Sequence, residues 1–462
     1  MSFNAVLAEI FARHADAPAL LSQDGQTLTF AKLERTVSAL ATRLRGEGIS
    51  PGQCVAVAVD NRALRIALFL ALARLGPDVA LVSSTGALAR RGQKIDLAIR
   101  FADQRTEGAE RSIVFDQDWL ATAPDPSLAA TTPGTLVLST SGSTGAPRYV
   151  RIHPQAYLDM AASLHDGIGQ SVGPVLVSIP ETAPFSVFLL LRAFRGGHGF
   201  TGMNPTGAET LEEAARFGVR EIMVTPLALN ELVAAAEGGA PKGVFTRVCV
   251  FGSVAEAALL SRAEKAFGCS VFICNGATEI GQTSFGRFDA ATYVTGWSGK
   301  PSAGTEVRIG DGESERLYLR GHLSRHMQGY IGGPPAYDAE GWFDTGDIAR
   351  LTPEGVLMIE GRADNVINLG GSKYAAELIE TLVGQCPGVA MSAAVRLQPP
   401  DGMAPELGVA VVANAAFDAA GVRNFLAEKL HTSARIRIVT CPRLPSLPSG
   451  KLDRAAVAAL FS

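Results

Sequence analysis

The chain has 462 residues, of which 47% are hydrophobic and 19% are charged, and its formal net charge is -4 at pH 7. A chain of this length predicts two to four domains with a sizeable core, because domains average about 150 residues. The composition argues against a largely disordered chain. It also gives no electrostatic signature for nucleic acid or an anionic membrane, so we expect neither partner.

The first 20 residues indicate an amphipathic helix, because Glu9, Arg13 and Asp16 interrupt the apolar core that a signal peptide would need. No apolar run approaches the roughly 18 to 20 residues of a membrane span. The six cysteines form no CxxC pair and lie mostly in apolar runs, so we predict buried, unpaired thiols in a reducing compartment. We therefore expect a cytoplasmic protein.

Strands and helices alternate along the first 276 residues. Helical spacing of apolar residues predicts a helix between Thr29 and Gly48 with Thr29 as its N-cap. A strand, a helix and a second strand follow at 54–59, 62–76 and 78–84. The same alternation predicts strands at 174–180, 220–226, 247–253 and 270–276, with helices at 210–218 and 257–268. This order predicts an α/β fold with mostly parallel sheets covered by helices on both faces.

The rest of the chain differs in texture. Short alternating runs with many glycines predict a small β-rich subdomain at about 283–360. A last unit begins near Gly361 and has the size of an independent α+β domain of about 100 residues. Its strands are predicted at 365–371, 388–397, 406–414 and 435–440, its helices at about 375–384 and 418–430, and an exposed proline-rich loop at 445–453.

The run STSGSTGAPRYVR at 139–151 lies between two strand candidates, GTLVL and YVRI. A turn rich in glycine and hydroxyl groups can direct several backbone N–H groups and hydroxyls at one anion. The composition alone favours a solvated linker, and the order of residues in a Walker loop is absent. This loop alone therefore does not decide the function.

Further stretches occur in a fixed order with this loop. Together they resemble the motifs of the adenylate-forming enzymes, which include acyl- and aryl-CoA synthetases, peptide-synthetase adenylation domains and luciferases. The stretches are TSGSTGAPR (140–148), NGATEIG (275–281), GWFDTGD (341–347), GRADNVINLGGSKYAAELIE (361–380) and LPSGKLDR (447–454). The resemblance covers nearly the whole chain. It implies an N-terminal domain, 1–361, that binds ATP and the acyl substrate and a smaller, mobile C-terminal domain, 362–462, that carries the adenylation lysine.

The resemblance implies a two-step reaction, in which a carboxylate attacks the α-phosphorus of ATP and a thiol then displaces AMP. Donors and cations fixed around the phosphates before reaction would stabilise the developing charge. The expected catalytic residues are Lys451, Thr278 and Glu279, and Glu279 would hold Mg²⁺. The expected nucleotide-binding residues are Thr140, Ser141, Gly142, Ser143, Thr144, Gly145, Arg148, Asn275, Gly276, Ala277, Asp347 and Arg362.

The resemblance assigns more specific roles within this set. Asp347 would accept both ribose hydroxyls, with Arg362 near the same sugar. Three positions depart from the family pattern: Arg148 replaces the usual lysine, Tyr149 the usual glycine, and Asn275 an aromatic residue that stacks on adenine in many relatives. Arginine keeps the charge but differs from lysine in geometry. Outside the family context, Lys451 would be interpreted as a solvated surface charge.

The resemblance also implies a domain rotation between the two steps. Asp364 matches the hinge position of the family, and a hinge needs only a few residues that absorb the change in backbone angles. Rotation would withdraw Lys451 and present a hairpin to the site for the thiol step. The hairpin residues are Gly370, Gly371 and Lys373.

The acid to be activated is less clearly indicated. Relatives that take α-amino acids carry an acidic residue in a Phe-Asp-x-Ser stretch, whereas 181–191 offers Phe185 and Ser186 with no evident counter-charge. An unpaired ammonium in an apolar pocket would be costly, so we expect an aliphatic or aryl carboxylic acid without an α-amino group. Seven residues are candidates for the wall of the acyl pocket, and plain core packing explains each of them equally well. They are Phe185, Phe251, Gly252, Ser253, Ala277, Ile280 and Gly281.

The leading hypothesis is an acid–CoA ligase that uses ATP, Mg²⁺ and CoA. The alternative within the family is a stand-alone adenylation enzyme that loads the phosphopantetheine thiol of a carrier protein. A third hypothesis is an inactive nucleotide-binding relative, which the departures at Arg148, Tyr149 and Asn275 keep open. For the assembly, we consider a homodimer beside the monomer.

Overall fold

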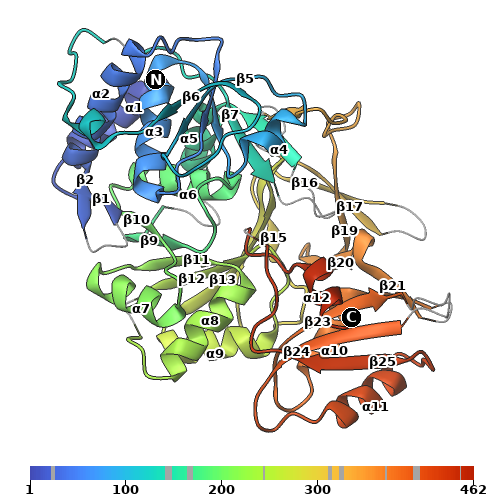
Figure 1. The fold of residues 1–462 in the computed structure, drawn as a ribbon. Helices are drawn as coiled ribbons and strands as arrows, with labels where there is room; N and C mark the ends of the chain where they lie inside the picture. Colours follow the sequence, from blue (N-terminus) through green and yellow to red (C-terminus); the bar gives the residue numbers. More distant parts are fainter. Residues whose placement is uncertain are drawn as a thin grey trace.

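The computed structural model describes residues 1–21, 26–128, 130–140, 148–163, 170–242, 245–310, 315–321, 327–369, 372–398, 406–447 and 449–462. Two large sheets and their helices make up the N-terminal part, and the C-terminal elements, orange and red in Figure 1, gather beside α8 and α9. The α/β class expected from the sequence is confirmed. No helix among the described residues is long and apolar enough to cross a membrane.

The first large sheet has seven strands in the order β18-β8-β7-β4-β3-β5-β6. Its five strands from β7 to β6 are parallel, while β8 and β18 add antiparallel pairs at one edge. Every residue of β3 is buried, as expected for a parallel strand covered on both faces. The strands are β3 (Cys54–Val57), β4 (Asp78–Leu81), β5 (Ile95–Arg100), β6 (Ala109–Val114), β7 (Leu136–Thr140), β8 (Arg148–Ile152) and β18 (Met327–Tyr330).

The second large sheet has nine strands in the order β15-β14-β13-β12-β11-β9-β10-β1-β2. The strands from β13 to β1 are parallel, so their carboxyl ends lie at one edge of the sheet. The strands are β1 (Pro18–Leu21), β2 (Thr27–Thr29), β9 (Val175–Val177), β10 (Phe200–Gly202), β11 (Glu221–Val224), β12 (Arg247–Phe251), β13 (Ser270–Ala277), β14 (Gly281–Arg287) and β15 (Lys300–Pro301).

The largest apolar cluster joins strands of both sheets with α1 (Phe3–Arg13), α2 (Phe30–Gly46), α3 (Arg62–Leu75), α5 (Pro154–Ser163) and α6 (Pro184–Arg195). A second cluster packs α7 (Gly207–Arg216), α8 (Pro226–Glu237) and α9 (Ala257–Phe267) on the nine-stranded sheet. The short α4 (Thr85–Ala89) lies on the seven-stranded sheet. The predicted cap of α2 is confirmed, because the Thr29 hydroxyl accepts a hydrogen bond from the Lys32 N–H at 3.3 Å.

The region 283–360 is rich in strands, as predicted, but it is less independent than the sequence suggested. Four antiparallel strands form a small sheet: β16 (Glu306–Ile309), β17 (Arg316–Arg320), β19 (Phe343–Leu351) and β20 (Leu357–Arg362). The strands β14, β15 and β18 instead extend the two large sheets. A short local run gives no information about such distant pairing, and the sequence alone could not assign these strands.

The C-terminal elements pack on a three-stranded sheet in the order β23-β24-β25. One of its apolar clusters contains residues of α10 and α11, and another contains residues of α12. The elements are β21 (Val366–Leu369), β22 (Ser372–Ala375), α10 (Ala376–Gly384), β23 (Val389–Leu397), β24 (Glu406–Ala413), α11 (Ala419–Lys429), β25 (Ile436–Thr440) and α12 (Arg454–Ala459). The α+β character expected for this unit is confirmed.

Two local expectations need correction. The loop at 445–453 is not fully exposed, because a bridge between Ser446 and Leu452 closes it and most of its described residues are half-buried. All six cysteines are unpaired, but Cys269, Cys386 and Cys441 are only half-buried. An apolar run places a residue in a strand or helix, but it does not say how completely the neighbours cover it.

Candidate active site

The expected ribose-binding pair, Asp347 and Arg362, lies on adjacent strands. The two residues face each other across β19 and β20, and the Arg362 guanidinium donates to the Asp347 carboxylate at 3.1 Å and to the Thr345 carbonyl at 2.6 Å. A Cβ at Gly346, whose φ is +72°, would lie 2.8 Å from an Arg362 nitrogen. Burial raises the pKa of Asp347, while Arg362 and then Lys451 oppose this rise.

Lys451 enters this region from the C-terminal loop. The Leu447 N–H donates to the Lys451 carbonyl at 2.8 Å, which makes the loop a tight turn. A Cβ at Gly450 would lie 2.9 Å from a methyl carbon of Thr225, and one at Gly252 would lie 3.9 Å from Lys451 Cε. Thr225 follows β11 and Gly252 follows β12, so Lys451 reaches the carboxyl edge of the nine-stranded sheet. Ligands of open α/β sheets bind at this edge.

Nearby protein atoms and charges set the electrostatic surroundings of Lys451. The residue reaches solvent, yet protein atoms surround its amine closely enough to lower its pKa. The charges of Asp347 and Glu279 act in the opposite direction, and Arg362 adds to the lowering. The three candidate residues from separate motifs thus act on one ammonium.

Glu279 lies in the turn that joins β13 to β14 and is only 7% exposed. The Tyr330 hydroxyl donates to its carboxylate, and the Tyr337 hydroxyl donates to its backbone carbonyl at 2.6 Å. Burial, followed by the charge of Glu279, raises the pKa of both phenols. Thr278 is half-buried in the same turn. The turn therefore holds a buried carboxylate with an ordered donor.

Asn275, Gly276 and Ala277 form the end of β13, next to this turn. The Asn275 side-chain oxygen accepts a hydrogen bond from the Gly276 N–H at 2.9 Å. This side chain therefore folds onto its own backbone. It presents a small amide at the position where many relatives have an aromatic ring.

The ends of the glycine-rich loop are described, although its centre is not. Thr140 ends β7 and pairs directly with Arg148, the first residue of β8. The predicted residues Ser141, Gly142, Ser143, Thr144 and Gly145 lie outside the described residues. The Arg148 guanidinium lies 5.4 Å from the centroid of the Tyr330 ring. Tyr149 is 3% exposed and packs in the core of the seven-stranded sheet.

The predicted acyl-pocket residues fall into two groups. Phe185 and Phe251 contact each other with ring centroids 4.8 Å apart. Gly252 and Ser253 are exposed after β12, and Gly252 lies near Lys451. Ile280 is 1% exposed and packs with the apolar cluster of the small sheet, against which Ala277 also packs. Gly281, at the start of β14, is buried. These contacts favour core packing for Ile280.

The expected hinge residue Asp364 is exposed in a single 3₁₀ turn, η3 (Ala363–Asn365). On either side of it, Glu377 of α10 accepts hydrogen bonds from the Arg362 N–H at 3.4 Å and the Asn365 amide at 2.7 Å. Glu377 also pairs with Arg454, three residues after Lys451. This carboxylate connects the hinge segment to the helix that follows the lysine loop.

The hairpin expected to act in the thiol step is formed by β21 and β22. Lys373 is exposed on β22, whereas Gly370 and Gly371 lie outside the described residues. Hairpin formation at this point agrees with the sequence expectation. Its contact with a thiol remains a proposal.

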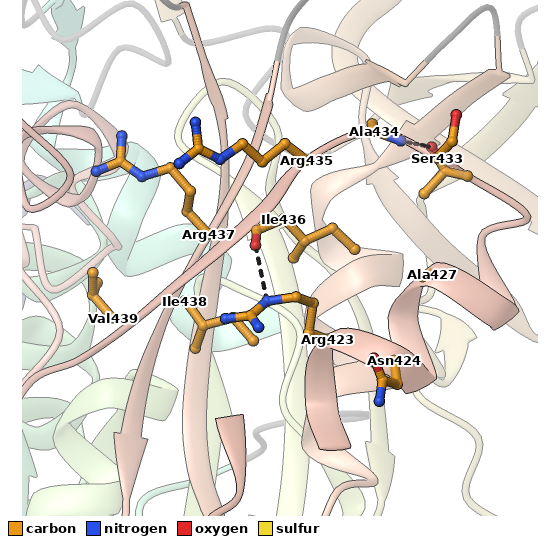
Figure 2. Close-up of a pocket in the computed structure, with 11 residues that line it drawn as sticks. Arg423, Asn424, Ala427, Ser433, Ala434, Arg435, Ile436, Arg437, Ile438 and Val439 are labelled. Atoms are coloured by element: carbon orange, nitrogen blue, oxygen red, sulfur yellow. Dashed lines mark hydrogen bonds between the residues drawn. The ribbon is translucent and has the colours of Figure 1, made fainter. Parts of the chain in front are cut away.

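A hollow of about 660 Å³ lies away from all these residues, between α11 and the edge strand β25 (Figure 2). In Figure 2, the Arg423 guanidinium donates to the Ile436 carbonyl, at 3.2 Å. Charged side chains on an edge strand discourage pairing with another chain. None of the expected nucleotide-binding residues lines this hollow.

The chain belongs to the AMP-binding enzyme family, whose model matches residues 7–330. Its relatives include Triostin synthetase I of Streptomyces triostinicus, 29% identical over 97% of this chain and 92% of that protein. Sulfoacetate--CoA ligase of Cupriavidus necator is 28% identical over 97% of this chain and 96% of that protein. The family resemblance expected from the motifs is confirmed, and the chain is identified as an adenylate-forming enzyme.

The fold agrees with this identification. The crystal structure of the anthranilate CoA ligase AuaEII in complex with anthranoyl-AMP matches with a TM-score of 0.84, covering 100% of this chain and 97% of that chain at 18% identity. At this identity the match shows the shared two-domain fold.

Several polar contacts of the site could not be predicted from the sequence. No motif assigned Tyr330 or Tyr337 a contact with Glu279. Glu377 and Arg454 likewise gave no signal of their ion pair, since 76 residues separate them in sequence and only the fold brings them together. Contacts of this kind depend on tertiary placement.

Proposed function

We propose that this enzyme activates a carboxylic acid with ATP to an acyl adenylate and then transfers the acyl group to the thiol of CoA, as an AMP-forming acid–thiol ligase. The observation that carries the proposal is the position of Lys451, which reaches the carboxyl edge of the nine-stranded sheet beside Gly252 and interacts electrostatically with Asp347 and Glu279. An ammonium at this place can stabilise negative charge that develops on the carboxylate and the α-phosphate.

The nucleotide would be held by groups from both large sheets and the small sheet. Asp347 would accept the ribose hydroxyls, with its carboxylate oriented by Arg362. The glycine-rich loop, whose described ends are Thr140 and Arg148, would bind the departing pyrophosphate. Fixed donors at these positions would act without reorganisation during the reaction.

Mg²⁺ fits the residues present. Glu279 supplies one buried, hydrogen-bonded carboxylate, and the described residues contain no cluster of three or more acidic, histidine or cysteine side chains that could hold a metal alone. Mg²⁺ commonly binds through one or two carboxylates together with substrate phosphates. When bound, it would neutralise charge on the phosphate oxygens.

The substrate would be an aliphatic or aryl acid without an α-amino group. Phe185 and Phe251 form an aromatic pair, and Phe251 directly precedes Gly252, which lies near Lys451. The carboxylate of the stretch at 181–191 belongs to Glu181, which is 3% exposed and forms ion pairs with Arg65 and Arg62. Because Arg62 and Arg65 already neutralise the Glu181 carboxylate, this carboxylate is not available to pair with a substrate ammonium.

The C-terminal domain, which we place at 362–462, would rotate about Asp364 between the two steps. Rotation would remove Lys451 and bring the hairpin with Lys373 to the adenylate. The named activity of Sulfoacetate--CoA ligase supports CoA as the acceptor. Loading of a carrier-protein thiol is the alternative, since the same hairpin could serve either thiol.

The test is a panel of carboxylic acids assayed for pyrophosphate release, with CoA, with a phosphopantetheinylated carrier protein and with neither. We expect acid-dependent release and a thioester only with CoA. A thioester only with the carrier would favour the alternative, and no release with any acid would favour an inactive relative.

A further inference from the structure

Two tyrosine side chains hydrogen-bond to Glu279. Tyr330 donates to its carboxylate and Tyr337 to its backbone carbonyl. Both contacts with Glu279 therefore come from phenol hydroxyls, which are neutral at ordinary pH.

Tyr330 also contacts a second charged group. Its ring lies 5.4 Å from the Arg148 guanidinium, within the range of a cation–π interaction. The contact depends on strand pairing, because β18 lies against β8 and Tyr330 is opposite Val150. One phenol thus touches the end of the phosphate loop and the candidate metal-binding carboxylate.

A phenol suits this position for an electrostatic reason. A neutral donor holds a buried carboxylate in one orientation and stabilises its charged form. A lysine or arginine paired directly with the carboxylate would neutralise the charge that a metal ion needs. The second carboxylate oxygen of Glu279 accepts no hydrogen bond from the described residues. The arrangement therefore keeps the negative charge of Glu279 available.

We propose that Tyr330 is a positioning residue that orients the Glu279 carboxylate and the Arg148 guanidinium toward the same phosphate group of ATP. This inference rests on the proposed function, and it adds a residue that the family motifs did not assign. The substitution of lysine by arginine at position 148 fits it, because a planar guanidinium stacks on the Tyr330 ring better than an ammonium does.

The variant that isolates the hydroxyl is Tyr330→Phe, which keeps the aromatic ring under Arg148. Mn²⁺ serves as the probe, since carboxylate and phosphate oxygens bind it as they bind Mg²⁺. Its affinity is measured by electron paramagnetic resonance in the full chain with a non-hydrolysable ATP analogue and no acid, so no turnover occurs. A hydrogen bond to a charged group predicts a loss of affinity of about 10-fold or more.

The matched control is Tyr337→Phe, which removes a phenol hydroxyl from the backbone of the same glutamate and should have the smaller effect. In steady-state assays, Tyr330→Phe should raise the KM for MgATP by about 10-fold and the KM for the acid by less than about 2-fold. Thermal unfolding of both variants checks the fold. Arg148→Lys should also have a smaller effect in the Tyr330→Phe background than alone.

Unchanged Mn²⁺ affinity in Tyr330→Phe, or an equal loss in Tyr337→Phe, would overturn the positioning role. The proposed function would be wrong if the wild-type enzyme binds Mn²⁺ and the analogue but releases no pyrophosphate with any acid. In that case the Mn²⁺ affinity of Tyr330→Phe would still decide whether Tyr330 is a positioning residue.

Discussion

Arg443 and Glu231 form an ion pair between the C-terminal domain and helix α8, with Nε and Oε1 2.6 Å apart. Two further contacts cross the same boundary. A Cβ at Gly384 of α10 would lie 3.5 Å from the side chain of Glu256, which precedes α9, and Leu227 of α8 packs with the C-terminal cluster that contains Leu444. These contacts are present in the conformation in which Lys451 lies at the carboxyl edge of the nine-stranded sheet.

The Arg443–Glu231 pair should favour the first half-reaction. The Arg443 side chain is 65% exposed, and exposed pairs contribute about 0.2 to 1 kcal/mol. We therefore expect Arg443→Ala to slow ATP–pyrophosphate exchange by about 2- to 5-fold and to leave the thiol step from supplied acyl adenylate unimpaired.

A matched control for this variant is Arg435→Ala. Arg435 is similarly exposed, at 74%, and pairs with Glu406 inside the C-terminal domain. It should leave both half-reactions unchanged. Equal effects of the two substitutions would argue against a specific role of the contact between domains.

The hinge assignment predicts unequal effects on the two half-reactions. Proline fixes φ and restricts the preceding residue, so Asp364→Pro should hinder rotation while Lys451 remains in place. The thiol step should slow on the order of 10-fold more than adenylate formation, measured by single-turnover kinetics. Asp364→Ala is the control for loss of the side chain. Similar losses in both steps would contradict the hinge.

The surroundings of Lys451 predict the alkaline side of the pH profile. Enclosure lowers the pKa of its amine from 10.5, and the neutral amine cannot stabilise the developing charge. The kcat/KM for ATP, which reports the free enzyme, should therefore fall with rising pH at a pKa below 10.5. Lys451→Arg should move this limb to higher pH, since arginine stays protonated. If the alkaline limb stays at the same pH in Lys451→Arg, the titrating group is not Lys451.

The layered α/β fold could be predicted because helical spacing and apolar strand runs are local signals. The helix that begins after Thr29 and the strand at Cys54 both lie where their patterns placed them. The pairing of strands could not be predicted from such local signals. The order of the sheets joins β18 to β8, which is about 175 residues earlier in the chain, and no local pattern encodes such a pair.

The candidate site divides in the same way. Asp347, Arg362 and Lys451 could be found from motifs, and the fold brings them together. Tyr330 could not be singled out, because its contact with Glu279 depends on the meeting of a strand of one large sheet with a turn of the other. For Ile280 the pattern left pocket and core open, and only the surrounding side chains indicate core packing.

The central claim is that Lys451 acts in adenylate formation, and Lys451→Ala tests it most directly. Exchange of pyrophosphate into ATP, with an acid that the wild type accepts, should fall by about 10² to 10³, as when a preorganised group is removed from a transition state. Conversion of supplied acyl adenylate by the thiol should stay within a few-fold of wild type, whereas Lys373→Ala should affect mainly that second step. Unimpaired exchange in Lys451→Ala would contradict the claim.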